Sequence, residues 1–275
     1  MDLWFTEKIG DKVGLALKIK QTLYREQTPY HSVDVLETEY FGKMLVLDGA
    51  VMLTERDEFI YHEMIAHVPL STHHDPRKVL AIGGGDGGTV REVLKHASVE
   101  HVDLVEIDGR LIEICKTYFP KVSHGLNDPN VTVRTEDGIS FVKGPKDIYD
   151  VVLVDSTDPV GPAKELFEKA FFEDIYGCLR QDGIMVAQSE SPFLHATIVQ
   201  EVCRILKDVF PVVRMYLASI PTYPSGLWCF AFCSKQYDPL VHFKSKGVES
   251  QTRYYNGEIH RSAFSLPSFI QEWVK

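Results

Sequence analysis

A short apolar segment that runs directly into a glycine-rich loop is the feature that most constrains the fold. Residues 79–82 read VLAI, residues 83–88 read GGGDGG, and a segment with helical spacing follows. Gly83, Gly85 and Gly88 satisfy the G-x-G-x-x-G pattern in the strand–turn–helix setting that nucleotide-binding βα units require. Such a loop lets a ligand approach the backbone closely at the start of a helix. The pattern therefore predicts an α/β fold that binds a nucleoside.

Short apolar segments and longer amphipathic segments alternate along the chain after residue 77. This rhythm is typical of a mostly parallel sheet covered by helices on both faces, so we expect a Rossmann-like, doubly wound α/β sheet. The predicted strands are Val79–Ile82, Val102–Ile107, Val131–Thr135, Val151–Asp155 and Ile184–Gln188, with a closing pair at Met215–Ile220 and Trp228–Ser234. The predicted helices are Thr89–His96, Arg110–Phe119, Leu166–Leu179 and Ala196–Val209.

The first 55 residues predict a second, all-β unit. Asp48-Gly49 separates two short apolar runs, and an Asp-Gly pair in that setting is a strong hairpin signal. From Asp57 the apolar spacing changes to that of a helix, with Pro69 near its end. We therefore expect a small N-terminal β-strand domain over residues 1–55 and a Rossmann-like domain over residues 56–275. The short apolar runs of the first domain are 15–19, 33–36, 44–47 and 51–53.

Composition narrows the classes of function. The 275 residues carry a formal charge of −10, whereas nucleic-acid binding requires a basic face. An acidic surface is compatible with a cationic substrate, although many cytoplasmic enzymes are acidic for solubility alone. The five cysteines form no C-x-x-C pair, which fits a reducing cytoplasm better than disulfides or a zinc site. We expect no secretory signal, because the N-terminus has an acid at position 2 and no long apolar core. We expect no membrane span, because no apolar run approaches ~20 residues.

An acidic residue inside the glycine loop, Asp86, discriminates among nucleosides. A dinucleotide would place its pyrophosphate near this loop, where a further carboxylate repels it. A sulfonium nucleoside carries positive charge and no phosphate. Asp86 would also repel the carboxylate of S-adenosylmethionine and pair with the ammonium of the decarboxylated form. The loop alone leaves open a turn that only reverses the chain, and also a nicotinamide-dependent dehydrogenase.

Further acidic residues follow the predicted strands. Glu106 ends the second strand, Asp137-Gly138 follows the third, and Asp155 ends the fourth. In an open α/β sheet the carboxyl ends of the strands line the binding crevice, and an acid at the position of Glu106 binds ribose hydroxyls. We therefore expect these residues to surround one ligand.

The segment 155–162, DSTDPVGP, carries the predicted chemistry. An amine that attacks the sulfonium nucleoside must be neutral. A free alkylamine resembles lysine, so its deprotonation at pH 7 costs about 4–5 kcal/mol. A carboxylate that holds the ammonium and accepts its proton lowers this barrier. We expect Asp155, at the rigid strand end, to be that base and Asp158 to anchor substrate charge. An Asx turn that caps a helix is the other interpretation of the segment.

Two tyrosines are candidates for the wall of an amine channel. Tyr61 precedes His62 on the predicted helix before the glycine strand, and Tyr223 lies in the turn 220–226. Aromatic rings can line a methylene chain and attract its ammonium ends, and the Tyr61 hydroxyl can orient the lone pair of the amine. Packing in the core or in the turn is the other interpretation for each ring.

Six segments together resemble the spermidine synthase family of polyamine aminopropyltransferases. They are LVLDG at 45–49, DEFIYHEM at 57–64, the glycine loop at 83–88, the segment 155–162, IPTYPSG at 220–226 and HRSAF at 260–264. The resemblance covers nearly the whole chain. It implies a methyltransferase-type Rossmann-like catalytic domain behind a small N-terminal β domain. It also implies SN2 attack by putrescine on the methylene next to the sulfonium of decarboxylated S-adenosylmethionine, giving spermidine and 5′-methylthioadenosine.

The resemblance further implies roles for single residues. Asp155 would accept the proton beside Tyr61. The nucleoside would be bound by Gly83, Gly85, Glu106, Asp137, Gly138 and Pro162, and the amines by His62, Asp86, Asp155, Ser156, Thr157, Asp158 and Tyr223. No metal or cofactor is implied, because the nucleoside is a co-substrate. The family usually forms homodimers or homotetramers through its N-terminal strands.

One position departs from the family pattern. Family members usually have Gln in the N-terminal strand that reaches the nucleoside, whereas this chain has Tyr30-His31-Ser32. His31 can donate or accept one hydrogen bond there, but it cannot do both as an amide does. The acceptor also stays open: agmatine, cadaverine or spermidine could replace putrescine, because the depth of the pocket sets the length of the acceptor. Putrescine as a methyl acceptor is a further alternative.

Overall fold

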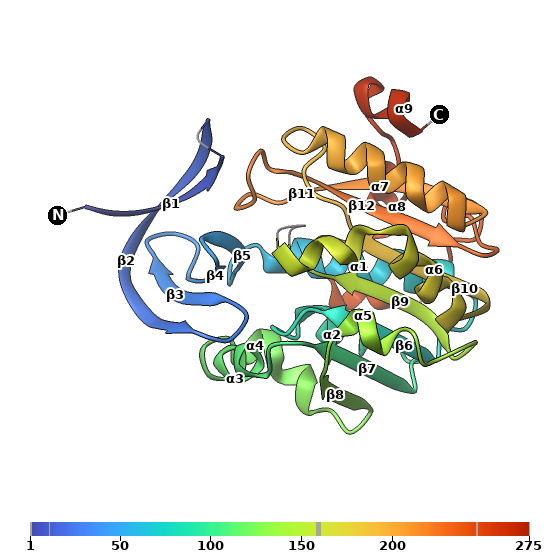
Figure 1. The fold of residues 1–275 in the computed structure, drawn as a ribbon, viewed down its shortest axis with the longest axis horizontal. Coiled ribbons are helices and arrows are strands. Elements are labelled where there is room, and N and C mark those ends of the chain that lie inside the picture. Colours follow the sequence, from blue (N-terminus) through green and yellow to red (C-terminus); the bar gives the residue numbers. More distant parts are fainter. Residues whose placement is uncertain (1, 11, 158–160, 246, 275) are drawn as a thin grey trace.

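The chain folds around two β-sheets (Figure 1). The computed structural model describes residues 2–10, 12–157, 161–245 and 247–274, and for residues 161–163 only the backbone. The first sheet has five strands and the second has seven. This arrangement confirms the expected class, an α/β fold with an additional N-terminal all-β unit. No helix in the described ranges is long and apolar enough to cross a membrane.

The N-terminal sheet is an antiparallel meander in which each strand pairs with the next along the chain. The predicted hairpin at Asp48-Gly49 is confirmed: φ is +52° and +87° at these residues, and Leu47 pairs with Ala50. Two positive φ angles are typical of a type I′ turn, which matches the twist of a hairpin. The strands are β1 (Leu3–Ile9), β2 (Val13–Gln27), β3 (Ser32–Thr38), β4 (Lys43–Leu47) and β5 (Ala50–Thr54).

The second sheet has the strand order β11-β12-β10-β9-β6-β7-β8. Neighbours from β10 through β8 run parallel, and β12 is antiparallel to both β10 and β11. Every strand predicted for this sheet is present. The strands are β6 (Lys78–Gly83), β7 (His101–Glu106), β8 (Val131–Thr135), β9 (Tyr149–Asp155), β10 (Leu179–Gln188), β11 (Val212–Ser219) and β12 (Leu227–Ser234).

Helices cover both faces of this sheet (Figure 1). Side chains alternate along β6, so Val79 and Ala81 pack with α1 and α2, whereas Leu80 and Ile82 pack with α6 and α7. The α-helices are α1 (Glu58–Thr72), α2 (Gly88–Val93), α3 (Gly109–Tyr118), α4 (Pro120–Ser123), α5 (Gly138–Phe141), α6 (Lys169–Cys178), α7 (Ala196–Val209), α8 (Gly257–Ala263) and α9 (Ser268–Val274). Three short 3₁₀ helices are η1 (His124–Asn127), η2 (Gly161–Phe167) and η3 (Val248–Gln251).

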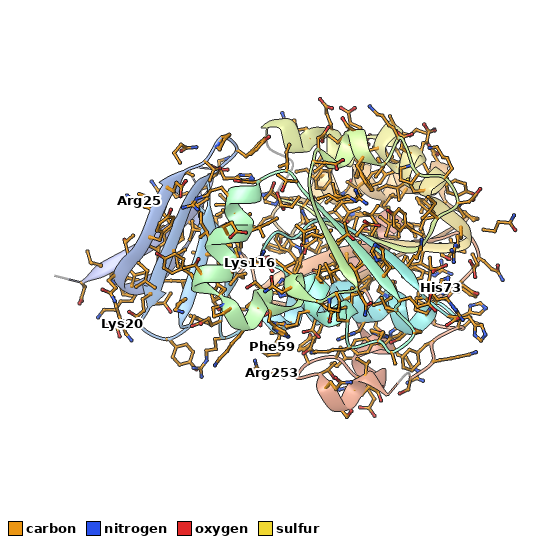
Figure 2. The ribbon with its side chains drawn as sticks, turned by 90° about the horizontal axis from the view of Figure 1, so that it is seen from below. Lys20, Arg25, Phe59, His73, Lys116 and Arg253 are labelled. Atoms are coloured by element: carbon orange, nitrogen blue, oxygen red, sulfur yellow. The ribbon has the colours of Figure 1, made fainter. Side chains whose placement is uncertain are left out.

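The predicted helix at 166–179 begins later than expected. Residues up to Phe167 form the 3₁₀ helix η2, and α6 starts only at Lys169. The helix predicted from Asp57 is α1, and Pro69 lies inside its last turn. Nearly all of α1 is buried, because the C-terminal segment covers its outer side. Figure 2 shows Arg253 beside Phe59 of α1, with the guanidinium carbon 3.7 Å from the ring centroid.

The N-terminal sheet packs against helix α3, one of the helices that follow the strands of the second sheet. Val35 of β3 and Leu45 of β4 share one apolar cluster with Ile114 of α3. The Nζ atom of Lys43 donates to the Tyr118 carbonyl over 2.8 Å. Lys20 and Arg25 of the long strand β2 are exposed and lie on the part of this sheet that is distant from the second sheet (Figure 2). The meander is therefore fixed against α3 and α4, which follow β7 along the chain.

Candidate active site

The glycine loop is pressed against the end of β9. In the parallel pairing of β6 with β9, Gly83 lies opposite Asp155. A Cβ atom on Gly83 would lie 2.2 Å from the Asp155 carbonyl oxygen, and one on Gly84 would lie 2.5 Å from a carboxylate oxygen of Asp155. Both glycines also have positive φ, at +77° and +73°. Glycine is therefore required at both positions, because the loop backbone lies directly against Asp155. The G-x-G-x-x-G pattern does not include Gly84, so sequence reasoning missed this position.

Two hydroxyl groups hold the Asp155 carboxylate. The Tyr61 hydroxyl donates to Oδ1 over 2.7 Å, and the Thr89 hydroxyl donates to Oδ2 over 2.6 Å. Burial and then the neighbouring Asp86 carboxylate raise the pKa of Asp155 above its usual range. Burial and Asp155 raise the pKa of Tyr61 well above its usual value, so Tyr61 stays a neutral donor. The result is a fixed carboxylate with increased proton affinity, which suits a proton acceptor.

An ion pair links the loop to helix α1. The Nε2 atom of His62 lies 3.3 Å from Oδ1 of Asp86, and its Nδ1 atom lies 2.6 Å from Oε2 of Glu58. Burial alone would lower the pKa of His62, but Asp86 and Glu58 outweigh burial and raise that pKa to about 10. Burial likewise opposes ionisation of Asp86, yet His62 and the Gly88 N–H hold the pKa of Asp86 below its usual range. Asp86 therefore has a cationic partner, which the sequence argument did not include.

Glu106 accepts backbone hydrogen bonds beside the same loop. The N–H groups of Gly85 and Asp108 donate to its two carboxylate oxygens over 3.1 and 2.9 Å. Burial raises the pKa of Glu106 to about 7. A Cβ atom on Gly85 would lie 2.9 Å from Cγ of Glu106, so this glycine also permits a close approach.

The N-terminal sheet brings His31 to this end of the site. The Thr28 hydroxyl donates to Asp108 over 2.6 Å, which anchors the turn before β3. The Nδ1 atom of His31 lies 2.8 Å from Asp48 Oδ2. Burial has the largest effect on the pKa of Glu106, and the nearby His31 acts in the opposite direction.

Asp137 and Gly138 lie where β8 passes into α5. The Asp137 carboxylate accepts the N–H groups of Ile139 and Ser140, each over 3.1 Å, and so caps α5. A Cβ atom on Gly138 would lie 2.6 Å from Cγ2 of Ile82. The capping bonds occupy part of the Asp137 carboxylate, and they fix the backbone of this turn next to Glu106.

The remaining predicted residues are described unequally. The carbonyl oxygens of Ser156 and Thr157 lie 3.2 and 3.5 Å from the amide nitrogen of Gln188. The buried hydroxyl of Ser156 has no hydrogen-bond partner within the described chain. Asp158 and the side chain of Pro162 lie outside the described residues.

Tyr223 faces the site with its ring but not with its hydroxyl. Its hydroxyl donates to the Met52 carbonyl over 2.7 Å. Its ring centroid lies 5.9 Å from that of Tyr61 and 4.7 Å from that of Trp228. The ring therefore belongs to an aromatic wall beside Asp155, and it also joins the N-terminal sheet to the turn after β11.

A second pair of buried acids was missed by sequence reasoning. Glu190, just after β10, is fully buried with φ at +67°, and its Oε2 lies 2.7 Å from Nδ1 of His195. Its Oε1 has no hydrogen-bond partner within the described chain. Glu7 of β1 accepts the Val51 N–H over 3.0 Å, and burial, followed by the charge of Glu190, raises the pKa of Glu7 to about 7. The sequence offered one signal for this pair: Glu190 closely follows a predicted strand, as the other candidate acids do. Glu7 lies within β1, so no such signal marks it.

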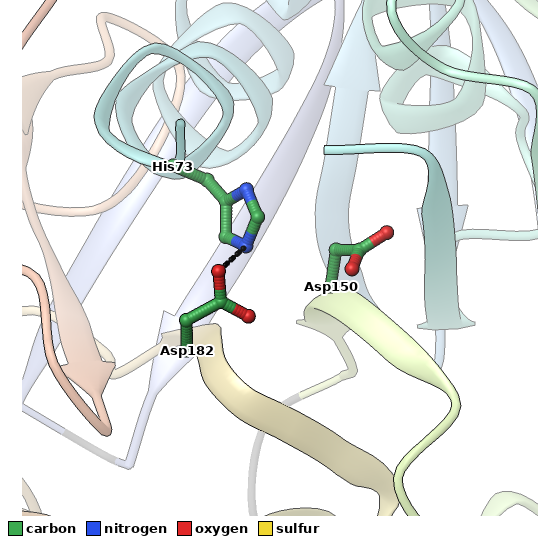
Figure 3. Close-up of side chains that lie close together, drawn as sticks. All are labelled: His73, Asp150 and Asp182. Atoms are coloured by element: carbon green, nitrogen blue, oxygen red, sulfur yellow. Dashed lines mark ion pairs between the residues drawn. The ribbon is translucent and has the colours of Figure 1, made fainter. Parts of the chain in front are cut away.

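A third group of ionisable residues lies at the opposite end of the sheet. His73, Asp150 and Asp182 have ligand atoms within 4.8 Å of one another (Figure 3). Asp150 already accepts the N–H groups of Arg77 and Lys78 and a guanidinium N–H of Arg180, over 2.8 to 2.9 Å. These contacts occupy most of the lone pairs of Asp150 and place a cation beside it, so the group fits a structural ion cluster better than a metal site.

Comparisons with known proteins identify the family of the chain. Residues 58–245 match the spermine/spermidine synthase domain, and residues 3–55 match the spermidine synthase tetramerisation domain. The chain is 52% identical to a polyamine aminopropyltransferase of Caldicellulosiruptor saccharolyticus, over 100% of this chain and 99% of the relative. It is 50% identical to the polyamine aminopropyltransferase of Shouchella clausii, over 100% of both chains.

Solved structures give the same result. A crystal structure of spermidine synthase in complex with the transition-state analogue AdoDATO superposes with a TM-score of 0.96 at 41% identity, covering 99% of this chain and 94% of that chain. The spermidine synthase from Thermotoga maritima superposes with a TM-score of 0.95, also at 41% identity and with the same coverage. On its fold, its full-length sequence similarity and both domain matches, this chain belongs to the spermidine synthase family and is a polyamine aminopropyltransferase.

Proposed function

We propose that this enzyme is a spermidine synthase, which transfers the aminopropyl group of decarboxylated S-adenosylmethionine to putrescine. The observation that carries the proposal is the environment of Asp155. It is a partly buried carboxylate with raised proton affinity, held by two hydroxyl groups against a glycine loop. Such a group can take a proton from an alkylammonium at neutral pH, which is the costly step of amine alkylation.

The nucleoside of the donor would bind along the ends of β6, β7 and β8. Glu106 would accept hydrogen bonds from the ribose hydroxyls, with Gly83 and Gly85 letting the ligand approach the loop. Its raised pKa supports this role, because a buried carboxyl that is partly protonated when the site is empty gains a partner on binding. Asp137 and Gly138 would meet the adenine through the fixed turn, Pro162 would close over it, and His31 would supply a hydrogen bond from the N-terminal sheet.

The aminopropyl ammonium would bind beside Asp86 and His62. Because His62 cancels much of the charge of Asp86, the carboxylate of Asp155 supplies the excess negative charge next to the loop. This arrangement favours a sulfonium that ends in an ammonium over one that also carries a carboxylate. Decarboxylated S-adenosylmethionine is therefore the proposed donor.

The reaction would be a single displacement. The lone pair of the acceptor amine attacks the methylene carbon next to the sulfonium, and the carbon–sulfur bond breaks with its electron pair going to sulfur. Sulfur becomes the neutral thioether of 5′-methylthioadenosine, and Asp155 accepts the proton that the amine nitrogen loses. Tyr61 would hold Asp155 in place while Ser156, Thr157 and Asp158 line the polyamine path.

The far amine of putrescine would meet the buried acids Glu190 and Glu7. Gln188 connects them to the active-site segment, because its amide donates to the Ser156 carbonyl and its oxygen accepts the Glu190 N–H. An unpartnered carboxylate oxygen in a buried position favours a cation. The rings of Tyr61 and Tyr223 would flank the methylene chain between the two ends.

Residues 1–55 and 56–275 are the two proposed domains of each chain. Copies of the chain would assemble as a homodimer or homotetramer. The match of residues 3–55 to a tetramerisation domain supports this, as does the exposure of Leu3, Trp4 and Val13 on β1 and β2. All five cysteines are buried and unpaired, which supports a cytoplasmic location.

The acceptor is tested by competition. The purified protein would receive decarboxylated S-adenosylmethionine with equal concentrations of putrescine, cadaverine, agmatine and spermidine, and products would be identified by mass. We expect spermidine to dominate, and we expect Glu190→Gln to raise the KM for putrescine far more than the KM for the donor. A product mixture led by another acceptor would contradict putrescine as substrate and leave aminopropyl transfer intact.

A further inference from the structure

A row of alternating charges runs from the active site between α1 and α2. His62 contacts Asp86 on one side and Glu58 on the other. Glu58 forms a two-point pair with Arg91 of α2, with Nη1–Oε1 at 2.9 Å and Nη2–Oε2 at 2.8 Å. The Nε atom of Arg91 donates in turn to Glu92 over 2.8 Å. Within the described residues, neither Glu58 nor Arg91 forms a hydrogen bond or ion pair with Asp155, so the proposed base does not explain them.

Packing fixes the His62 ring within this row. A Cβ atom on Gly88 would lie 2.2 to 2.5 Å from three atoms of the ring, so the start of α2 lies directly against its face. The side chain of His62 is only 3% exposed, and Tyr61 packs edge-on against it at 5.5 Å. The ring therefore cannot turn away from the two carboxylates. Since carboxylates only accept hydrogen bonds, both ring nitrogens must carry protons to satisfy them.

A cation at this point solves an electrostatic problem of the active site. Asp86 and Asp155 are both partly buried, and the charge of Asp86 opposes ionisation of Asp155. Two like charges in a buried site would share one proton unless a cation compensates them. Positive charge on His62 lowers the pKa of both Asp86 and Asp155 and so favours their ionised forms. The charged or titratable groups that face His62 are Glu58 and Tyr61 of α1, Asp86 of the loop, Asp155 of β9 and, through Glu58, Arg91 of α2.

We propose that Glu58 and Arg91 are positioning residues that hold His62 as a permanent imidazolium, so that Asp86 and Asp155 can be ionised side by side before substrate binds. Arg91 fixes the Glu58 carboxylate, Glu58 fixes the charge of His62, and His62 sets the charge of the two acids. The inference rests on the proposed role of Asp155 as proton acceptor. Burial opposes the charge on Glu58, but His62 and Arg91 outweigh burial and keep the pKa of Glu58 below its usual range. Glu58 is therefore ionised beside His62, as the proposal requires.

The first test measures His62 directly and needs no turnover. The imidazole signals of the wild-type protein would be followed by NMR from pH 6 to 9 and assigned with a His62→Gln variant. We expect His62 to stay doubly protonated over the whole range in the wild type, and to titrate within it in Glu58→Gln. A wild-type His62 that titrates near 6.5 overturns the proposal, whether or not the enzyme transfers aminopropyl groups.

The second test is the pH dependence of kcat/KM. Glu58→Gln should move the acidic limb upward by about one pH unit, because a neutral His62 no longer compensates Asp86 and Asp155. Glu58→Asp keeps the charge and should restore the wild-type limb at least in part. It also keeps the test decisive if Glu58→Gln folds poorly.

Two controls separate positioning from stability and net charge. Glu92→Gln breaks the neighbouring pair with Arg91 but leaves Glu58 beside His62, so it should lower stability without moving the acidic limb. Glu113→Gln removes one carboxylate from the surface of α3, where its side chain is 60% exposed, and should change neither property. An acidic limb of folded Glu58→Gln that coincides with that of the wild type would contradict the role of Glu58.

Discussion

Replacement of Asp155 by Asn tests the proposed base with little change in shape. The carboxylate accepts one hydroxyl from Tyr61 and one from Thr89, over 2.7 and 2.6 Å. An Asn side chain can accept from one hydroxyl and donate to the other, because hydroxyl groups reorient freely. Only the charge-assisted part of the bonds is lost, about 1 kcal/mol. The removed charge is also one that burial disfavours. We therefore expect Asp155→Asn to fold with near-normal stability.

The expected kinetic effect is far larger than the effect on stability. Deprotonating an alkylamine at pH 7 without help costs about 4–5 kcal/mol. A positioned base typically contributes about 10²–10⁴ in rate, or about 3–5 kcal/mol. We expect kcat to fall by a factor in this range. The affinity for 5′-methylthioadenosine should stay within about threefold, since Glu106, Gly85 and the end of β7 are untouched.

Two assays and one control decide this prediction. Release of 5′-methylthioadenosine gives kcat, and calorimetry gives the affinity for that product. The rate of Asp155→Asn should rise about tenfold per pH unit up to the pKa of the amine, because the variant depends on amine already deprotonated in solution. Asp208→Asn, at the exposed end of α7, is the matched control and should behave as the wild type. A kcat within tenfold of the wild type at pH 7 would refute the role of Asp155 as base.

Two further predictions concern the acids and the glycine loop. Since burial raises the pKa of Glu106 to about 7, its carboxylate form, which best accepts ribose hydroxyls, becomes dominant as pH rises. The affinity for 5′-methylthioadenosine should therefore increase from pH 6 to 8 and lose this dependence in Glu106→Gln; a flat wild-type profile in calorimetry would contradict it. The folded-state pKa values of Glu7 and Glu106, about 7 against an ordinary 4.5, also mean that their contribution to stability is present below pH 4.5 and is lost as pH rises through 7. The melting temperature of the unliganded protein should therefore fall as pH rises from 4.5 through 7, and it should fall less in Glu7→Gln. Gly88→Ala would push a methyl group to 2.2 Å from the His62 ring, and overpacking of this kind costs about 1–3 kcal/mol. Gly144→Ala meets its nearest atom at an ordinary 3.5 Å and should be nearly neutral; equal denaturation midpoints for the two variants would count against the close packing of His62.

Local patterns predicted most of the fold. The glycine loop, the Asp48-Gly49 hairpin and the alternation of strands and helices each follow from neighbouring residues, and all are present. Strand β1 was missed because its apolar residues Leu3 and Trp4 are exposed, so no buried face produces a pattern. The late start of α6 was missed because a 3₁₀ helix and an α-helix follow each other without a break in apolar spacing.

The site was only partly predictable, because its contacts join distant parts of the chain. Thr89 reaches Asp155 across 66 residues, and Arg91 reaches Glu58 across 33. No spacing rule links such pairs. The positive φ of Glu190 and the need for glycine at Gly84 are likewise consequences of packing rather than of a motif. The acids at strand ends were predictable because the topology of a parallel sheet places those ends together.

The most direct measurement of the central claim is the stoichiometry of a single reaction. The purified protein would be incubated with decarboxylated S-adenosylmethionine and putrescine, and both products would be quantified by mass spectrometry as the donor is consumed. We predict one spermidine and one 5′-methylthioadenosine for each donor molecule, with S-adenosylmethionine giving neither product. Consumption of the donor without spermidine, or equal turnover of the carboxylated donor, would contradict the proposed function.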